Sequence, residues 1–220
     1  MFNSAASRAV MRGERRNPQR TRERLLQAAF REIYKSGFRG TDLDTILCTA
    51  GVTKGAMYHH FENKEALGYA VVDEVLASIG QEKWSWPLKN AMNPIDTLIG
   101  IIRSTSLKPS DVRCGCALNN LSQEMSSIDE GFRRRTAKLF GDWQVAIAGA
   151  LRNGKKRGLV RRGVNPEEMA SFLIATYEGY ISLAKSHRDA ATLQGGERAM
   201  IKFLESLRAP RSRTRAGRTL

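Results

Sequence analysis

Signals for the start and end of helices recur along the whole chain, whereas the apolar–polar alternation expected of strands is scarce. Two Asn-Pro pairs, at residues 93–94 and 165–166, each place a capping side chain before a proline suited to the first helical turn. Pro87, in the segment Trp84-Ser85-Trp86-Pro87, is expected to end a helix that starts near residue 63. The chain is therefore predicted to be all-α, with nine or ten helices. The expected helices span residues 20–36, 41–49, 53–59, 63–83, 95–107, 117–125, 129–157, 167–186 and 196–207.

Positive charge is concentrated at the two ends of the chain, which has 220 residues and a formal net charge of +14. Residues 1–64 hold twelve Lys and Arg against six acidic residues, and residues 208–220 hold five Arg and no acid. The segment between them is nearly balanced. This distribution suggests an anionic partner for the N-terminal part, with nucleic acid as the leading candidate, although an Arg-rich tail can also be a solvated end.

Several protein classes are disfavoured by what the sequence lacks. No run approaches the roughly 18 apolar residues of a membrane span, and the first residues lack the apolar core of a secretory signal. Three cysteines, an odd number, do not suggest a disulfide framework and fit a reducing cytoplasm. Because no catalytic triad, carboxylate pair, phosphate-binding Gly loop or metal signature is visible, we expect no enzymatic activity, no cofactor and no bound metal.

Residues 41–60 form the most informative segment. Two helices of about seven residues, joined by a turn that contains Gly51, have the dimensions of a helix-turn-helix. In such a unit the second helix enters the major groove of DNA. Thr53 and Lys54 offer a hydroxyl and a cation at its start, and Gly55 permits close backbone approach. Tyr58 and His59 add polar tips on rigid rings, so these five residues are the candidate DNA contacts.

Other residues of this segment have structural explanations. Met57 and Phe61 are apolar at i, i+4 spacing and are expected in the core. His60 is expected to be packed rather than to touch DNA. Asp42 and Asp44 would repel phosphate, so a capping role is expected for them.

The N-terminal region resembles the TetR family of bacterial transcription regulators. The resemblance covers residues 21–72 and rests above all on one run. That run reads Ala50-Gly51-Val52-Thr53-Lys54-Gly55-Ala56-Met57-Tyr58-His59-His60-Phe61-Glu62-Asn63-Lys64-Glu65-Ala66-Leu67.

The resemblance implies roles for individual positions. Tyr58 and Lys64 match the phosphate contacts of the family, while Thr53, Lys54, Gly55 and His59 match its groove-facing helix. The first helix of the family's motif often starts Thr-Thr. Here it starts Thr41-Asp42, which implies a contact at Thr41 and leaves the contact at position 42 open.

The C-terminal region is similar to a narrower branch that senses acrylate-like or other electrophilic compounds. The similar segments are Arg113-Cys114-Gly115-Cys116-Ala117-Leu118-Asn119-Asn120-Leu121-Ser122-Gln123-Glu124-Met125 and Tyr177-Glu178-Gly179-Tyr180-Ile181-Ser182-Leu183-Ala184-Lys185. In that branch, residues at the Cys116 and Lys185 positions can form a redox or electrophile switch.

The residues of this region allow more than one interpretation. Trp84, Trp143 and Tyr177 could line an effector pocket, but aromatic residues at helical spacing more often fill a core. A metal site at Cys114 and Cys116 is disfavoured, because no His/Cys pair follows at zinc spacing. A reactive thiol is the alternative to an inert buried cysteine, since the adjacent Arg113 and a nearby helix N-terminus favour the thiolate.

These observations predict a basic arm (1–18), a helix-turn-helix DNA-binding domain (19–66), a helical effector-binding and dimerisation domain (67–208) and a basic tail (209–220). The predicted function is that of a cytoplasmic homodimeric repressor, which binds a palindromic double-stranded DNA operator and is released by a small-molecule effector. One alternative is a thiol switch through Cys116. Another, from a different class, is a basic protein that coats DNA without sequence preference.

Overall fold

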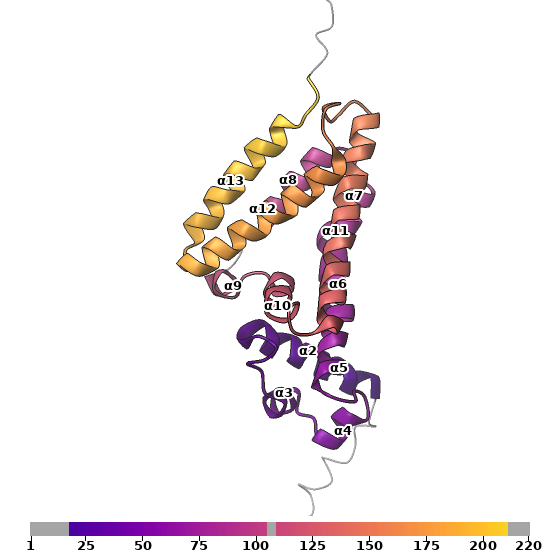
Figure 1. Ribbon diagram of the computed structural model, residues 1–220, viewed down its shortest axis with the longest axis vertical. Coiled ribbons are helices and arrows are strands. Elements are labelled where there is room, and N and C mark those ends of the chain that lie inside the picture. The colour runs from indigo at the N-terminus through magenta and orange to yellow at the C-terminus, as the bar shows by residue number, and fades with distance from the viewer. Residues whose placement is uncertain (1–17, 105–108, 211–220) are drawn as a thin grey trace, which may run out of the picture. The chain divides into compact units, whose positions relative to one another are not determined.

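The computed structural model describes residues 18–104 and 109–210, and within these residues it contains helices, turns and no strand (Figure 1). A single isolated antiparallel bridge joins Val160 and Arg208. The prediction of an all-α fold is therefore confirmed. No described helix is long and apolar enough to cross a membrane. The basic arm and tail predicted from the sequence fall almost wholly outside the described residues.

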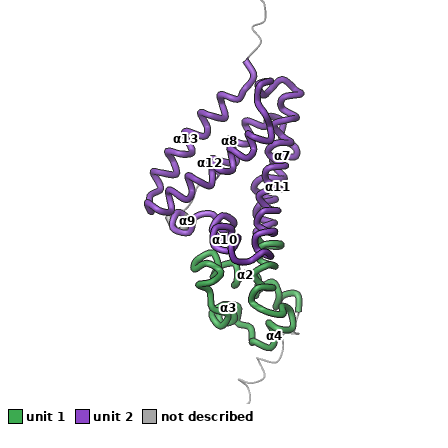
Figure 2. The backbone as a smooth tube through the Cα atoms, in the orientation of Figure 1, with its two compact units in different colours: residues 1–75 green, residues 76–220 purple. Residues whose placement is uncertain are grey.

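The chain folds as two compact units, residues 1–75 and 76–220 (Figure 2). The first unit is built on α2, whose apolar face is buried and whose end is marked by Gly37 in the left-handed conformation, at φ 77°. Its helices are α2 (Pro18–Ser36), α3 (Leu43–Ala50), α4 (Lys54–Tyr58) and α5 (Lys64–Ala70), which continues into the π-helical η2 (Val71–Leu76).

The second unit is a larger helical body. Its helices are α6 (Ala77–Gly80), η3 (Gln81–Ser85), α7 (Trp86–Lys89), α8 (Pro94–Ser104), α9 (Pro109–Cys114), α10 (Ala117–Met125), α11 (Glu130–Lys156), α12 (Pro166–His187) and α13 (Ala190–Ser206). The long α11 packs against α12, and α12 packs against α13 along an antiparallel pair (Figure 1). The apolar stripe of α11 supplies much of the core through Phe132, Trp143, Ile147 and Leu151.

Both Asn-Pro helix starts are confirmed. The Asn93 carboxamide oxygen accepts a hydrogen bond from the Ile95 backbone N–H at 3.0 Å, directly before α8. The Asn165 oxygen accepts from the N–H groups of Glu167 and Glu168 at 3.1 and 3.4 Å, directly before α12. In each case the side chain satisfies backbone donors that the first helical turn leaves without a partner.

The expected helix end at Pro87 is wrong, because helical structure continues without interruption from Lys64 to Lys89. Pro87 is the second residue of α7, at the point where the helical hydrogen-bonding pattern changes. The π-helical η3 directly precedes it and accommodates the change in hydrogen-bonding pattern.

The predicted start of the last helix at Gly196 is also wrong. α13 begins six residues earlier, where Asp189 accepts hydrogen bonds from the N–H groups of Ala191 and Thr192 at 3.0 and 2.9 Å. Gly196 instead lies inside α13, against the ring of Tyr180 on α12, at a place where a Cβ atom would collide with that ring. Its role is close packing of two helices and not the start of one.

Candidate functional site

The first unit contains two short helices joined by a tight turn, as predicted for residues 41–60. Asp42 caps α3 by accepting hydrogen bonds from the N–H groups of Asp44 and Thr45 at 3.1 and 3.4 Å. Gly51 ends α3 in the left-handed conformation, at φ 60°. Thr53 then caps α4 by accepting from the Ala56 N–H at 3.3 Å. The turn is thus defined by local hydrogen bonds on both sides.

Arg24 of α2 fixes this turn from the outside, and sequence reasoning did not identify it. Its guanidinium donates to the backbone carbonyl of Ala50 and, at 3.1 Å, to that of Gly51. These carbonyls belong to the end of α3, where intrahelical partners are missing. A Cβ atom at Gly51 would lie 2.7 Å from the Arg24 guanidinium, so the absence of a side chain there permits the contact. An arginine on α2 carries no local signal for this role, because its partners lie 26 and 27 residues away.

The inner face of α4 is anchored in the core of the first unit. Met57 is fully buried, and Phe61 is 6% exposed, as their spacing predicted. His60 is half-buried, and its ring lies 6.5 Å from that of Phe61, which fits the packed role expected for it. Burial of Met57 fixes which face of α4 points away from the core.

The outer face of α4 carries the five predicted contact residues together. Thr53, Lys54, Gly55 and His59 are exposed, and Tyr58 is 50% exposed although it is a large aromatic residue. Among the described residues, and apart from its chain neighbours and the backbone of its own helix, no atom lies within 4 Å of a Cβ built at Gly55. Packing within the chain therefore does not require glycine at this helical position, and a partner that approaches the backbone closely would explain it.

Two further predicted contacts point inward. Thr41 is 4% exposed, and its hydroxyl donates to the Gly37 carbonyl at 2.6 Å, so its position does not agree with the implied contact to DNA. The difference arises because the hydroxyl donates to a backbone carbonyl directly after α2, where hydrogen-bond partners within the helix are missing. Lys64 is half-buried, and its ammonium donates to the Phe38 carbonyl at 2.7 Å while it lies 4.5 Å from the centre of the Phe38 ring.

In the second unit, the three aromatic residues considered for a pocket pack on one another. Trp84, Trp143 and Tyr177 are each at most 7% exposed. The Trp84 ring lies 5.6 Å from that of Trp143 and 5.5 Å from that of Tyr177, in an edge-on arrangement with the latter. Their geometry is that of a packed aromatic core.

Beside this core lies a cluster of polar side chains from three segments, which we name the Glu178 cluster: the half-buried Lys83 and Cys116 and the buried Tyr177 and Glu178. The Lys83 ammonium donates to the Tyr177 hydroxyl and lies 4.7 Å from the centre of its ring. Burial lowers the pKa of Lys83, and the nearby Cys116 and Glu178 oppose this shift. Glu178 is 6% exposed, and burial raises the pKa of its carboxyl group to about 7 although Cys116 and Lys83 act in the other direction.

The Glu178 carboxyl group is unusual because neither of its oxygens accepts a hydrogen bond of normal geometry from the described residues. A buried carboxyl group without donors costs free energy, so such a group calls for a functional explanation.

The expectation that Arg113 and the helix N-terminus favour a Cys116 thiolate is not met. Burial, followed by the charge of Glu178, raises the pKa of the Cys116 thiol to about 12, which outweighs the backbone N–H groups of α10 that lower it. The resting side chain is therefore a neutral thiol. Lys185, the other predicted switch residue, donates to the Asn120 side chain at 2.9 Å. Cys114 is a free, partly exposed cysteine, and the described residues contain no group of three or more side chains able to hold a metal ion.

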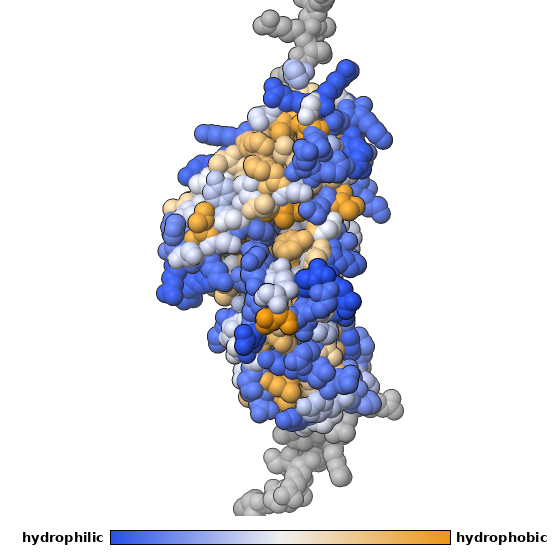
Figure 3. All heavy atoms as spheres, viewed as in Figure 1, coloured by the Kyte–Doolittle hydropathy of each residue, from blue (hydrophilic) through white to orange (hydrophobic). Residues whose placement is uncertain are grey.

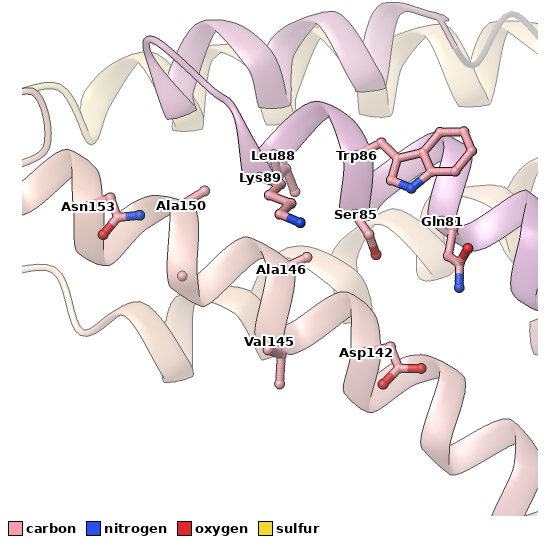
Figure 4. A pocket seen from close by; sticks show the side chains of 11 residues that line it. Gln81, Ser85, Trp86, Leu88, Lys89, Asp142, Val145, Ala146, Ala150 and Asn153 are labelled. Carbon is pink, nitrogen blue, oxygen red and sulfur yellow. The ribbon is translucent and has the colours of Figure 1, made fainter.

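A groove of about 630 Å³ also runs along the second unit between η3–α7 and α11 (Figure 4). Trp86 and Val145, which line it, are 61% and 74% exposed. None of the predicted sensor residues lines this groove, so it is separate from the Glu178 cluster.

Comparisons with known proteins match each of the two units to a model of the same family. The family model described as "Bacterial regulatory proteins, tetR family" matches residues 25–71, and the model "Tetracyclin repressor-like, C-terminal domain" matches residues 96–200. The transcriptional repressor DhaR of Mycobacterium sp. strain GP1 is 28% identical over 172 residues, which cover 78% of this chain and 86% of DhaR.

Solved structures give the same result. The reduced form of NemR from Escherichia coli superposes with a TM-score of 0.74 at 26% identity, covering 86% of this chain and 97% of NemR. A TetR transcriptional regulator from Chloroflexus aurantiacus superposes with a TM-score of 0.79 at 27% identity, covering 89% of this chain and all of the regulator. With a family model matched in each unit and a fold shared over most of its length, the chain belongs to the TetR family of bacterial transcriptional regulators.

Proposed function

We propose that this chain is a homodimeric repressor that acts on the bacterial chromosome in the cytoplasm and binds a palindromic operator through the outer face of α4. The observation that carries the proposal is the contrast within α4 between the buried Met57 and the exposed Lys54 and Tyr58. A short helix held by one face and polar on the other is suited to insertion into a major groove.

The proposed contacts divide into two kinds. Thr53, Gly55 and His59 face base edges or allow the backbone to come close to them, whereas Lys54 and Tyr58 reach bases or phosphates. Lys64 contributes to phosphate binding from the start of α5, because an ammonium group has three donors and one of them serves the Phe38 carbonyl. We do not include Thr41, which is buried.

Dimerisation is proposed to occur through α12 and α13, which would pair with their copies as a four-helix bundle. Two large apolar residues on α12, Phe172 and Leu183, are each 49% exposed. The Phe172 ring lies 5.0 Å from that of Phe203 on α13, so the two helices share an apolar surface. Apolar side chains are visible at the surface of the second unit among polar ones (Figure 3). A second copy that covered them would remove them from water.

Selection from fragmented genomic DNA at about 0.15 M salt tests the proposal. Recovery of one palindromic motif, with half-sites about one helical turn apart, is the expected result. Uniform recovery of all fragments would instead indicate the non-specific coating protein. The matched variants are Lys54→Ala, which should lose the motif, and Lys35→Ala, which removes an exposed lysine of α2 and should retain it.

Release by an effector can occur in two ways, and the presence of Cys116 in the Glu178 cluster favours the second. In the first version a small molecule binds reversibly in the second unit and favours a conformation that no longer fits the operator. In the second, a compound modifies Cys116, which is a free and partly exposed cysteine. One solved structure of the relative NemR is described as its reduced form.

The substitution Cys116→Ser separates the two versions. If Cys116 is the sensor, the variant binds the operator normally but is no longer released by an electrophile. If release is unchanged, reversible binding is the mechanism. Cys114→Ser is the control, since it removes a neighbouring free thiol and should leave release intact.

A further inference from the structure

The side chains of Lys83 on η3 and Tyr177 on α12 meet inside the second unit. The Lys83 ammonium donates to the Tyr177 hydroxyl. It lies 4.7 Å from the centre of the Tyr177 ring and 5.8 Å from that of the Trp84 ring. Both aromatic residues are buried, whereas Lys83 is half-buried and keeps some contact with solvent. A primary amine is thus held by a phenol hydroxyl beside two buried aromatic rings.

The residues next to this pair in sequence carry buried polar atoms that lack partners. These atoms are Nε1 of Trp84 and both carboxyl oxygens of Glu178, and none makes a hydrogen bond of normal geometry with the described residues. The other buried side-chain nitrogen and oxygen atoms of the described residues have partners. Because buried polar groups are normally paired, such a concentration indicates a place where a bound small molecule supplies what the chain does not.

A lysine amine in this environment is suited to act as a nucleophile. Burial lowers the pKa of Lys83, because the charged ammonium is desolvated. A larger share of the side chain is then the neutral amine, and desolvated lysines of this kind add to carbonyl compounds. The Tyr177 hydroxyl lies within hydrogen-bond reach of the nitrogen, so it can pass protons during such a reaction.

We propose that Lys83 is a binding site for uncharged aldehydes, which it holds as an imine formed with the help of Tyr177. The site involves neither DNA nor a cysteine, and in this it goes beyond the proposed function. It also names a chemical class for the reversible effector of that function, and this part of the inference rests on it.

The step balances without an oxidant or a reductant. Nζ of the neutral amine adds to the carbonyl carbon, and the carbon–oxygen π bond breaks. The Tyr177 hydroxyl protonates the oxygen and takes a proton back from the nitrogen, which gives a neutral carbinolamine. The nitrogen lone pair then forms the carbon–nitrogen double bond while the hydroxyl group, protonated by Tyr177, leaves as water. The proton on the nitrogen returns to Tyr177, and addition of water reverses the sequence.

The surroundings of Lys83 favour aldehydes that are uncharged and apolar. A charged substituent would lose its hydration beside the buried rings of Trp84 and Tyr177, which is costly. A carbinolamine hydroxyl is neutral and can both donate and accept a hydrogen bond. It therefore brings to this cluster the kind of partner that Trp84 and Glu178 lack.

Reductive trapping in the full-length protein tests the site. The protein is incubated with butanal and sodium cyanoborohydride, which reduces an imine to a stable secondary amine, and modified lysines are located by peptide mapping. We expect Lys83 to be trapped at least about tenfold faster than the exposed Lys89, since an adjacent proton donor contributes about 10²-fold or more. The anion 4-oxobutanoate, which has the same carbon chain, should trap Lys83 more slowly than butanal does.

Matched variants separate the roles of the two residues. Tyr177→Phe keeps the ring and should slow trapping at Lys83 at least about tenfold, whereas Tyr180→Phe, at a half-buried tyrosine of the same helix, should not. Lys83→Arg keeps the positive charge and should abolish the fast reaction, and Lys89→Arg should retain it. Circular dichroism establishes that each variant is folded.

Trapping of Lys83 no faster than that of Lys89 in the unsubstituted protein would overturn the proposal, and this result depends on no variant. An unchanged rate in folded Tyr177→Phe would overturn the role of Tyr177. Equal or faster trapping by 4-oxobutanoate would overturn the assignment of an uncharged ligand.

Operator binding by protein that carries the butyl group on Lys83 is measured separately. Weaker binding is expected if aldehydes are effectors. Unchanged binding would overturn that part of the inference and leave the aldehyde site itself intact. Because trapping is measured without DNA, failure of the site and failure of the repressor function are distinguishable.

Discussion

The outer face of α4 and the Glu178 cluster are the two regions with candidate chemistry, and they are built in opposite ways. On α4 the polar residues are exposed and close in sequence. The start of this helix is set by the Thr53 hydroxyl oxygen, which accepts a hydrogen bond from the Ala56 N–H three residues away. In the Glu178 cluster the polar residues are buried or half-buried, and Lys83 and Tyr177 meet although they lie 94 positions apart. A surface for a large external partner can therefore be encoded locally, whereas a polar cluster in the interior requires the whole fold.

The largest expected effect is on stability, at Met57, which anchors α4 in the core. Met57→Ala removes a fully buried side chain and should lower the free energy of unfolding by about 2–5 kcal/mol. Denaturant unfolding measures this, and the control Tyr58→Ala, at an exposed site, should have a much smaller effect on stability. Similar losses for both variants would mean that the two faces of α4 do not differ as described.

The pH dependence of stability tests the burial of the Glu178 carboxyl group. Burial raises the pKa of Glu178 from its ordinary value of 4.5 to about 7, so the folded state holds a proton that the unfolded state has lost. Stability from this group is therefore full below pH 4.5 and falls as the pH rises to 7, by about 3 kcal/mol. Glu178→Gln should flatten this decline, as measured by unfolding at pH 5 and pH 8, whereas Glu168→Gln should not.

Loss of an exposed cation on α4 should affect binding without affecting the fold. Lys54→Ala is expected to weaken operator binding by about 1–3 kcal/mol per half-site, and to leave unfolding unchanged within about 0.5 kcal/mol. Fluorescence anisotropy with labelled operator gives the affinity. A variant that binds normally would remove Lys54 from the proposed interface.

The smallest effect is expected at Gly55, where stability and binding should change in opposite directions. In Gly55→Ala the new methyl group meets no atom of the described residues beyond its own helix and chain neighbours. The variant should raise the free energy of unfolding by up to about 1 kcal/mol, because alanine favours the helix. The added methyl group should nevertheless weaken operator binding, since it lies on the face proposed to approach DNA. Unchanged affinity would mean that the backbone at this position does not come close to the operator.

The positions of most helices were predictable from the sequence, and the failures have one cause. Asn93 and Asn165 mark helix starts correctly because a cap acts within three residues. The prediction of a helix start at Gly196 is wrong because glycine is required there by the ring of Tyr180 on another helix, which leaves no room for a Cβ atom. Pro87 was misread as a helix end because the π-helical turn before it is not visible in the local pattern.

The candidate site also has features that local sequence predicts and features that depend on distant segments. Local sequence was sufficient to predict the turn between α3 and α4, the burial of Met57 and the exposed face of α4, because caps and helical periodicity act over a few residues. Only the tertiary structure shows that Thr41 is buried, that Arg24 holds the turn, and that burial raises the pKa of the Cys116 thiol. The physical reason is that desolvation and distant hydrogen bonds depend on which segments meet in space, and local sequence carries no record of that.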